Sequence, residues 1–593
     1  MDLTVSGGAP FNTGDVIGYR LGRTLVSLGT VIDIAEDLVT VLSESGGNLP
    51  PEGSQLQIVE LEPLISLDLQ IKLINDILSG NVRSPAVDLV IDGYELEPLR
   101  PIQSDGKMYS VDGGFELDEY QREVVEQILA LRDGELLLVV GPPGTGKTRV
   151  IQKAAYLLAT RGEKVLITSH TNRAVDNALE KLPLEMAVRV GRPEKVLPEI
   201  RRYMLGAKVR ERGGEQLAEL EENIKKLRNE RRKYLEHIKY IRGSGNQPAR
   251  SERLKRFKEE LRKVSRELKE LYRERNELLR SISESLVAEA RVIGSTLVKS
   301  QLDPLDRISF DTVLIDESSQ ASVTLALLGM LKARKWVLIG DPKQLLPIFK
   351  VLKNEKAQEE LSAFVYLCRK YPKRVLWLRL HYRSNSQIIR FAAREVYGNE
   401  IQPHPSCDNI ALKLAEPPRI EPLRPDMPVV FLHVQGSEER QKKSLLNRKE
   451  AEVCHRLVAE LRRCGVPESE VGVITPFRAQ RDLLLEKVRG SEVDTVDAFQ
   501  GREKEAVIFS VTATSPSSLR FASNPNRLNV ALTRPRSKLV VVGNARSIIE
   551  AGRQDKQLLV YRFLLYAYEL NAIYNWESMS WMTTRRVTKQ PTQ

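Results

Sequence analysis

Apolar and polar positions change their period along the chain, and each change predicts a different kind of structure. Residues 1 to about 62 hold short β-branched runs separated by Gly, Asp and Ser, a pattern typical of short strands and of a small β-barrel. Residues 64–79 have apolar positions at helical spacing and predict a helix that leads away from this region. Residues 86–109 are expected to be extended.

From Leu117 onward, short apolar runs alternate with segments of helical period, which indicates parallel sheets covered by helices. The first set of predicted strands comprises 136–140, 164–168, 312–315 and 336–339. The second set begins after Tyr371 and comprises 375–378, 429–434, 471–474, 507–511 and 538–542. The predicted fold class is therefore α/β, with two parallel-sheet domains in series.

A charged segment with helical apolar spacing, 214–283, interrupts the first α/β region. A turn rich in Gly and Pro at 243–248 divides it into two halves whose apolar repeat averages 3.5 residues, broken at Arg231 and Arg275. This pattern predicts an antiparallel coiled coil. A self-contained, solvated hairpin and an arm that contacts nucleic acid or a protein partner are both compatible with it.

These patterns together predict five parts of the chain. They are a β-barrel-like domain with a stalk helix at 1–116, a first α/β domain at 117–200 and 290–350, a helical insertion at 201–289, a second α/β domain at 351–560, and a C-terminal tail at 561–593.

Composition narrows the class of protein. A chain of 593 residues with 41% hydrophobic and 28% charged residues is typical of a globular protein of several domains. No segment approaches the roughly 20 apolar residues of a membrane span, and the N-terminus lacks the pattern of a secretory signal. The four cysteines form no C-x-x-C pair, so we expect neither a zinc site nor disulfides. We therefore expect an intracellular protein, located in the cytoplasm or, in a eukaryote, also in the nucleus. We expect a monomer.

The chain carries a formal net charge of +11 and has an isoelectric point near 9.2. An excess of Lys and Arg favours a polyanionic partner such as nucleic acid.

A glycine-rich segment follows the predicted strand 136–140 and precedes a helical segment, which is the setting of a phosphate-binding loop. Its backbone N–H groups would surround a polyphosphate at a helix N-terminus. Lys147 would reach the β- and γ-phosphates, and the Thr148 hydroxyl would bind Mg²⁺. A glycine-rich turn without a ligand is the alternative. The residues expected to bind the nucleotide are Gly141, Pro142, Gly144, Thr145, Gly146, Lys147 and Thr148.

Two further segments carry candidate chemistry at the ends of predicted strands. In Thr312–Ala321, Asp316 would hold Mg²⁺ while Glu317 orients and deprotonates the attacking water. An ordinary helix N-cap is the alternative for this acidic pair. In Gly340–Pro347, Gln344 is placed to sense the γ-phosphate.

In this order, the motifs resemble those of superfamily 1 helicases of the 5′→3′ type, closest to the Upf-type branch that includes senataxin and the immunoglobulin-mu-binding helicase. The resemblance covers about Leu117 to Ile548. It implies two RecA-like domains with ATP between them and single-stranded nucleic acid across their top. It also implies a small β-barrel on a helical stalk and a helical insertion in the first RecA-like domain.

The same resemblance assigns roles around the nucleotide. Gln121 would read the edge of adenine and Tyr382 would stack on it. Arg383 and Arg534 would be arginine fingers supplied by the second domain. An arginine inserted in this way raises the rate of phosphoryl transfer by about 10³–10⁵.

Two further residues of this site lie in the segment 496–503, where Gly501 would lie near the γ-phosphate and Glu503 near the ribose. Two positions depart from the family pattern. His381 stands where the family has Gln, and Pro535 stands where it usually has Ala, which removes a backbone donor.

Residues expected to contact the nucleic-acid strand lie at the ends of other predicted strands. Hydroxyl, amide and backbone N–H groups at such ends position phosphates without reading sequence. An ordinary turn or cap is the alternative for each. The candidates are Thr171, Asn172, Ser295, Thr296, Thr475, Pro476, Arg478 and Thr495.

The sequence therefore predicts a helicase or translocase that uses ATP and Mg²⁺ and moves 5′→3′ on single-stranded RNA or DNA as its two domains close and open. An ATP-gated clamp or ribonucleoprotein remodelling factor with little unwinding is the alternative, and the long hairpin would then recruit a protein partner. No motif distinguishes RNA from DNA, because that choice depends on contacts to the 2′-OH.

Overall fold

The computed structural model describes residues 2–4, 16–21, 24–35, 38–42, 58–60, 62–100, 116–192, 195–243, 248–349, 354–578 and 580–581. Several predicted features lie partly outside these ranges. They are the β-rich region 1–62, the turn predicted at 243–248 (residues 244–247), the segment 86–109 (residues 101–109), and the tail (residue 579 and those beyond 581). None of the described helices is both long enough and apolar enough to cross a membrane.

The chain divides into two compact units. Unit 1 consists of Met1–Ser84, Ala155–Val313 and Leu328–Ala333. Unit 2 consists of Pro85–Ala154, Leu314–Leu327 and Arg334–Gln593. The chain passes between the units several times, and one of these passages, at Val313, lies within strand β10, Phe310–Asp316.

Unit 1 begins with a five-stranded antiparallel sheet in the order β1-β4-β3-β2-β5. Its strands are β1 (Asp2–Thr4), β2 (Val16–Leu21), β3 (Thr24–Ala35), β4 (Leu38–Leu42) and β5 (Ile58–Glu60). The predicted short strands are confirmed, while closure into a barrel stays a prediction. Helix α1, Glu62–Leu78, confirms the helix expected at 64–79.

Unit 1 also contains three parallel strands in the order β7-β9-β8, with bounds Val165–Ser169, Val292–Thr296 and Ala187–Arg189. The register pairs Ser169 with Thr296 at the carboxyl ends of β7 and β9. Helix α5, Asn172–Leu179, follows β7 and has Asp176 on its buried side. The Asp176 carboxylate forms an ion pair with Arg189 at 2.7 Å, and both side chains are buried.

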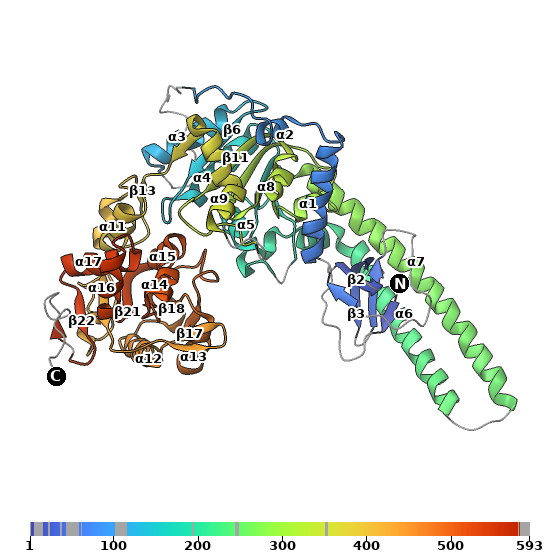
Figure 1. Cartoon of the computed structure of the whole chain (residues 1–593). Coiled ribbons are helices and arrows are strands. Elements are labelled where there is room, and N and C mark those ends of the chain that lie inside the picture. Colours follow the sequence, from blue (N-terminus) through green and yellow to red (C-terminus); the bar gives the residue numbers. More distant parts are fainter. Residues whose placement is uncertain are drawn as a thin grey trace. The chain divides into compact units, whose positions relative to one another are not determined.

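Two long helices occupy the predicted insertion, α6 (Leu205–Gly243) and α7 (Pro248–Glu289), and they lie side by side in Figure 1. An ion pair of 2.7 Å joins Arg212 to Glu289, and the rings of His237 and Phe257 stack with centroids 5.4 Å apart. These contacts pair the start of each helix with the end of the other. Gly214, at φ 44°, interrupts the helical backbone of α6.

Unit 2 contains three parallel strands in which β6 (Leu136–Val140) has β12 (Val375–Trp377) on one side and β11 (Ala333–Gly340) on the other. The prediction for β12 was therefore wrong in one respect, because it had placed 375–378 with the second set of strands. A second correction concerns α2, Pro85–Val90, which is helical where the chain was expected to be extended. Other helices of this region are α3 (Glu119–Ala130), α4 (Lys147–Thr160), α8 (Val323–Met330), α9 (Glu355–Leu361) and α10 (Ala363–Lys370).

The rest of unit 2 is built on a seven-stranded sheet in the order β19-β18-β20-β21-β15-β22-β23. All its pairs are parallel except the last, and its strands confirm those predicted at 429–434, 471–474, 507–511 and 538–542. The bounds are β15 (Val429–His433), β18 (Val471–Thr475), β19 (Glu492–Thr495), β20 (Lys504–Ser510), β21 (Pro535–Gly543), β22 (Ile573–Asn575) and β23 (Ser580–Trp581). The prediction of a tail from 561 was wrong for residues 561–578 and 580–581. They include most of a helix that packs on this sheet and the two strands β22 and β23.

Side chains of strand β20, an interior strand of this sheet, alternate between two apolar clusters, because successive residues of a strand point to opposite faces. Val507 and Phe509 belong to one cluster and Ile508 to the other. Helices on the first side are α11 (Ser386–Glu395), α14 (Pro516–Ala522), α15 (Pro525–Leu532), α16 (Ala545–Gln554) and α17 (Leu559–Glu569). Helices on the second side are α12 (Arg448–Arg463) and α13 (Arg478–Lys487). Two small pairs complete the unit, β13 (Leu380–His381) with β14 (Gln402–Pro403) and β16 (Glu439–Gln441) with β17 (Ser444–Leu446).

The Asp176–Arg189 pair generates a first prediction. Asp176→Ala should lower the stability of unit 1 by about 3–5 kcal/mol, because Arg189 would be left as an uncompensated buried charge. Amide hydrogen exchange of β7, β8 and β9 measures this locally. Arg232→Ala is the matched control, since its ion pair with Glu236 is largely exposed and should contribute little. Equal exchange rates in the two variants would contradict the prediction.

Candidate functional site

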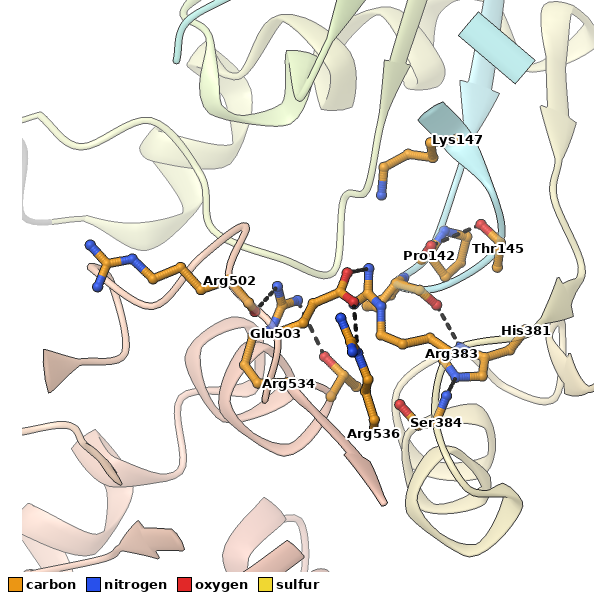
Figure 2. Close-up of polar contacts among 12 residues, drawn as sticks. Pro142, Thr145, Lys147, His381, Arg383, Ser384, Arg502, Glu503, Arg534 and Arg536 are labelled. Carbon is orange, nitrogen blue, oxygen red and sulfur yellow. Dashed lines mark hydrogen bonds and ion pairs between the residues drawn. The ribbon is translucent and has the colours of Figure 1, made fainter. Parts of the chain in front are cut away.

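The glycine-rich segment forms the loop between β6 and α4. Gly141, the first residue of the loop, donates its backbone N–H to the carbonyl of Gly340 at the end of β11, at 2.9 Å. Gly144 and Gly146 have φ of +71° and +86°, a region that glycine adopts without strain. Lys147 folds over the loop, and its Nζ donates to the Gly141 carbonyl at 2.6 Å. Figure 2 shows Lys147 with Pro142 and Thr145 of the same loop.

The carbonyls of this loop accept hydrogen bonds from side chains and backbone groups of several segments. The Thr145 hydroxyl donates to the Pro142 carbonyl at 2.8 Å. Gln121, which is buried on α3, donates from Nε2 to the Thr145 carbonyl at 3.0 Å. The Tyr382 N–H donates to the Gly144 carbonyl at 2.9 Å. Gln121 and Tyr382, both expected at adenine, therefore lie against the loop.

Asp118 connects these two residues. Its Oδ1 accepts from the Gln121 N–H at 2.9 Å, and its Oδ2 accepts from the Tyr382 hydroxyl at 2.7 Å. The Tyr382 ring packs on His404 with centroids 4.8 Å apart. The Gln121 side-chain oxygen caps α3 by accepting from the Asp118 N–H, 3.4 Å. The positions of both candidate adenine contacts thus depend on one carboxylate.

His381 occupies the position where the family pattern has Gln. Its Nδ1 lies 2.6 Å from the Pro143 carbonyl, and its Nε2 accepts from the Ser384 N–H at 2.8 Å (Figure 2). These partners require a neutral ring with the proton on Nδ1. Burial, with Arg383 nearby, lowers the pKa of His381 to about 3, so the ring stays neutral. A glutamine side chain also has a donor group, its NH₂, and an acceptor, its carbonyl oxygen. A neutral imidazole can therefore make the same kinds of hydrogen bond.

The acidic pair lies at the end of β10. Asp316 is buried, and that burial, together with the charge of Glu317, raises the pKa of Asp316 to about 7 although Lys147 opposes the shift. Glu317 has φ 50°, a left-handed conformation that costs a non-glycine residue about 1–3 kcal/mol. The Glu317 side chain accepts from Gln320 at 3.2 Å. Strain of this kind concentrates at functional positions.

Arg383 forms an ion pair with Glu503 at 2.5 Å, and Arg536 approaches the same carboxylate at 3.6 Å (Figure 2). Burial raises the pKa of Glu503, but Arg383, Arg534 and Arg536 outweigh it and hold the pKa below its usual value. Within the described residues, Nη1 of Arg383 is buried without a hydrogen-bond partner. Glu503, expected at the ribose, therefore pairs with a candidate finger here.

Arg534 contacts Gln344, the candidate phosphate sensor, with its Nη2 3.4 Å from the Gln344 Oε1. Burial lowers the pKa of Arg534 to about 10, so the guanidinium stays charged at neutral pH. The Gln344 Nε2 donates to Asp341 Oδ2 at 2.7 Å, which leaves the amide oxygen facing Arg534.

Tyr397 was not predicted from the sequence. Its hydroxyl donates to Asp341 Oδ2 at 2.6 Å and accepts from Asn529 Nδ2 at 2.8 Å. It is buried and connects the segment of Gln344 to the helix that precedes Arg534. Tyr397 lies outside every recognised motif, so no spacing signal identified it.

Two other positions of the predicted site have simple local settings. Gly501 is exposed and has φ +74°. Pro535 is the first residue of β21, a place where a strand tolerates a residue without N–H.

The candidate strand contacts of unit 1 already have local partners. Thr171 caps α5, its Oγ1 accepting from the Ala174 N–H at 3.4 Å, and Asn172 accepts from Arg189 at 2.8 Å. Thr296 accepts from the Lys299 N–H at 3.3 Å. The Ser295 hydroxyl is buried and has no partner among the described residues. Contact with a strand stays a prediction for all four.

In unit 2 the candidate strand contacts share one edge of the seven-stranded sheet. The register pairs Thr475 with Thr495 at the carboxyl ends of β18 and β19. Thr475 is fully buried and its hydroxyl lies 3.2 Å from that of Thr512, so a strand would reach its backbone rather than its side chain. Pro476 is half-buried and Arg478 is exposed. These four residues likewise stay predicted contacts.

Two AAA-domain family models match the chain, over residues 116–351 and 359–546. An uncharacterised ATP-dependent helicase of Methanocaldococcus jannaschii is 32% identical over 79% of this chain and 72% of that protein. The ATP-dependent helicase upf1 of Schizosaccharomyces pombe is 29% identical over 80% of this chain and 49% of that protein. This chain belongs to the superfamily 1 Upf1-like helicases.

Another relative of this helicase is the DNA-binding protein SMUBP-2 of Rattus norvegicus, 29% identical over 80% of this chain and 46% of that protein. The chain thus spans about half the length of the rat and fission yeast proteins. As in its family, the helicase hydrolyses ATP with Mg²⁺.

The residues of this helicase fit a magnesium ion beside a nucleotide. No cluster of three or more His, Cys, Asp or Glu suited to a metal occurs among the described residues. Mg²⁺ at a phosphate loop needs only one or two protein ligands, because phosphates and water supply the others. Asp316, buried and with its charged form disfavoured, is a carboxyl that a divalent cation would stabilise.

The left-handed loop glycine generates a second prediction. Gly144→Ala should weaken ATP binding at least about tenfold, because the new Cβ would lie 2.5 Å from His381 Cε1 and 2.7 Å from Arg383 Cβ. Titration with a fluorescent ATP analogue measures the loss. Gly162→Ala is the matched control, since Gly162 has φ +90° but no atom within 4 Å of an added Cβ. Equal ATP affinities of the Gly144→Ala and Gly162→Ala proteins would contradict the prediction that contact of the new Cβ with His381 and Arg383 weakens binding.

Proposed function

We propose that this helicase translocates 5′→3′ on single-stranded nucleic acid and unwinds duplexes as two RecA-like domains close and open around ATP. One observation carries the proposal. Arg383 and Arg534, from opposite ends of the second α/β region, both lie within the bonded network that surrounds the phosphate loop. Arg534 contacts Gln344. The Arg383 Cβ lies beside Gly144, and its buried Nη1 has no hydrogen-bond partner among the residues that the structure describes.

In the proposed mechanism, Lys147 and the loop N–H groups bind the phosphates, and Thr148 with Asp316 hold Mg²⁺. The bound ion supplies positive charge that offsets the charge on the phosphate oxygens. Glu317 orients the attacking water and accepts its proton. Arg383 and Arg534 stabilise the charge that spreads over the transferring phosphoryl group.

Gln344 and Glu503 are proposed to report the state of the nucleotide. Gln344 can turn its amide from Asp341 toward a γ-phosphate. Glu503, which pairs with Arg383, is proposed to exchange that partner for the ribose. Gly501 approaches the γ-phosphate, while Gln121 and Tyr382 hold adenine. Loss of the γ-phosphate would release the arginines, so domain opening is coupled to hydrolysis.

The strands support a proposal for the domain limits. We propose a first RecA-like domain of 117–200 and 290 to about 378, so that β12 belongs to it, and a second that extends to about 581. Residues 1–116 are proposed to be a β-barrel on a stalk, and 201–289 an antiparallel coiled coil. The coiled coil is also the proposed site for a protein partner.

The strand is proposed to run along the carboxyl ends of the parallel strands. Thr171, Asn172, Ser295 and Thr296 would contact it from unit 1, and all of them except Ser295 already have a local hydrogen bond. The candidates from unit 2 are Thr475, Pro476, Arg478 and Thr495. Both DNA and RNA are proposed substrates, since the rat relative is named a DNA-binding protein and nothing in these contacts excludes a 2′-OH.

A second candidate function is an ATP-gated clamp that binds a strand and releases it on hydrolysis. The length of α6 and α7, 39 and 42 residues, favours it, because such an arm can recruit a partner.

A third prediction concerns catalysis. Arg534→Ala should lower the kcat of strand-stimulated ATP hydrolysis by about 10³–10⁵, and Glu317→Gln by about 10²–10⁴. Lys147→Ala should abolish hydrolysis by weakening phosphate binding. Arg553→Ala, which removes an exposed arginine from α16, is the control and should retain full activity. Full activity of the Glu317→Gln protein would refute the assignment of the catalytic base.

A fourth prediction separates the helicase from the clamp. With ATP, the protein should displace the complementary strand from a 5′-tailed duplex and leave a matched 3′-tailed duplex intact. Gel or fluorescence strand-displacement assays on RNA and DNA versions measure both polarity and substrate. Strand-stimulated ATP hydrolysis without displacement on either tail would favour the clamp.

A further inference from the structure

Phe521, on α14, is an aromatic side chain that the catalytic site leaves unexplained. It is 45% exposed, and it is the only phenylalanine among the large exposed apolar residues that the structure describes. Leaving such a ring in water forgoes the stabilisation that its burial would contribute. An exposed ring at a defined place on a rigid scaffold therefore suggests a ligand.

Two neighbours hold the ring. The Phe477 ring, itself nearly buried, lies with its centroid 5.2 Å from that of Phe521 and is tilted by 35°. The Arg527 guanidinium carbon lies 5.2 Å from the Phe521 centroid, within the range of a cation–π contact. Arg527 is in turn held by Asp497 at 3.3 Å.

These neighbours place Phe521 between two segments proposed to contact the strand. Phe477 directly follows Thr475 and Pro476 and precedes Arg478. Asp497, the partner of Arg527, lies two residues after Thr495. Because Thr475 and Thr495 are paired in register, both segments leave the sheet at the same edge.

The helix that carries Phe521 is anchored at its N-terminus. Glu438 accepts hydrogen bonds from the N–H groups of Thr514 and Ser515, at 2.6 and 3.1 Å, and from the Ser518 hydroxyl. A carboxylate at this position also stabilises the positive end of the helix. The ring is thus presented by a fixed element rather than by a mobile loop.

Charge around the ring suits a polyanion. Arg478 and Arg520 are exposed, Arg527 is partly exposed, and the carboxylate of Asp497 is neutralised by its pair with Arg527. A ring flanked by cations is how proteins bind single strands without reading sequence: bases stack on the aromatic face while arginines attract the backbone.

We propose that Phe521 is a stacking platform for one base of the single strand, supported by Phe477 and flanked by Arg527. This inference rests on the proposed strand binding. It adds a base contact to a set that otherwise consists of hydroxyl, amide and backbone groups and the guanidinium of Arg478. Since any base has a π-face, the platform contributes affinity but little sequence preference.

The test measures binding of fluorescein-labelled oligothymidylate, and of the same backbone with abasic sites, by fluorescence anisotropy without nucleotide. Phe521→Ala should bind oligothymidylate about 5- to 150-fold more weakly, which corresponds to about 1–3 kcal/mol for one stacked base. Its affinity for the abasic strand should change less than twofold. The slope of log affinity against log salt should stay unchanged, because no phosphate contact is removed.

Three further variants keep the outcome interpretable. Phe521→Trp should retain binding, whereas Phe521→Leu keeps apolar bulk without the aromatic face and should lose affinity. Tyr568→Ala removes a comparably exposed aromatic ring from α17 and should bind as wild type. Thermal unfolding checks that Phe521→Ala is folded.

The platform is refuted if Phe521→Ala binds both probes as wild type does, if it weakens both probes equally, or if Phe521→Leu matches wild type. A wild-type protein that binds neither probe and whose ATP hydrolysis no strand stimulates would instead refute the proposed strand binding. The two failures are therefore distinguishable.

Discussion

A phosphate-binding loop must turn its N–H groups inward, so its carbonyls face outward and need partners of their own, because buried backbone polar groups are costly when unpaired. In this protein the carbonyls of five consecutive residues, Gly141 to Thr145, are each bonded, in turn by Lys147, Thr145, His381, Tyr382 and Gln121. Three of these partners come from outside the loop and its helix. The shape of the loop therefore depends on segments outside it, and those segments are the ones proposed to surround the nucleotide.

The strength of these outside contacts rests on burial and on charge. His381 serves as donor and acceptor because its burial keeps it neutral, and Arg383 is held by Glu503 at the same place. Asp341 accepts hydrogen bonds from Gln344 and Tyr397, and the first of these fixes the direction in which the Gln344 amide faces. The Gln344 amide and the Arg383 guanidinium are thus each oriented by a neighbouring carboxylate.

Much of this molecule could be predicted from local patterns. Apolar runs predicted β6, β11 and the strands around β20 because buried parallel strands are apolar on both faces. The motif spacing located Lys147, Asp316 and Arg534 at strand or helix ends. The predictions failed where the structure depends on contacts between residues far apart in sequence. The run 375–377 has the composition of a strand, but only tertiary pairing places it beside β6. Tyr397 acts through one hydroxyl whose partners are 56 and 132 residues away, so no spacing signals it.

The pairing of β12 with β6 also makes the two candidate fingers unequal. Arg383 follows the last residue of β12, Trp377, by six residues, and six residues span at most about 20 Å when extended. Its range of travel is limited by a short tether to the very sheet that carries the phosphate loop. Arg534 directly precedes β21 in the other sheet and has no such tether. In the proposed opening of the domains, Arg383 would stay within that distance of the sheet, whereas Arg534 would move with its own domain, so that only Arg534 would follow the full extent of the opening.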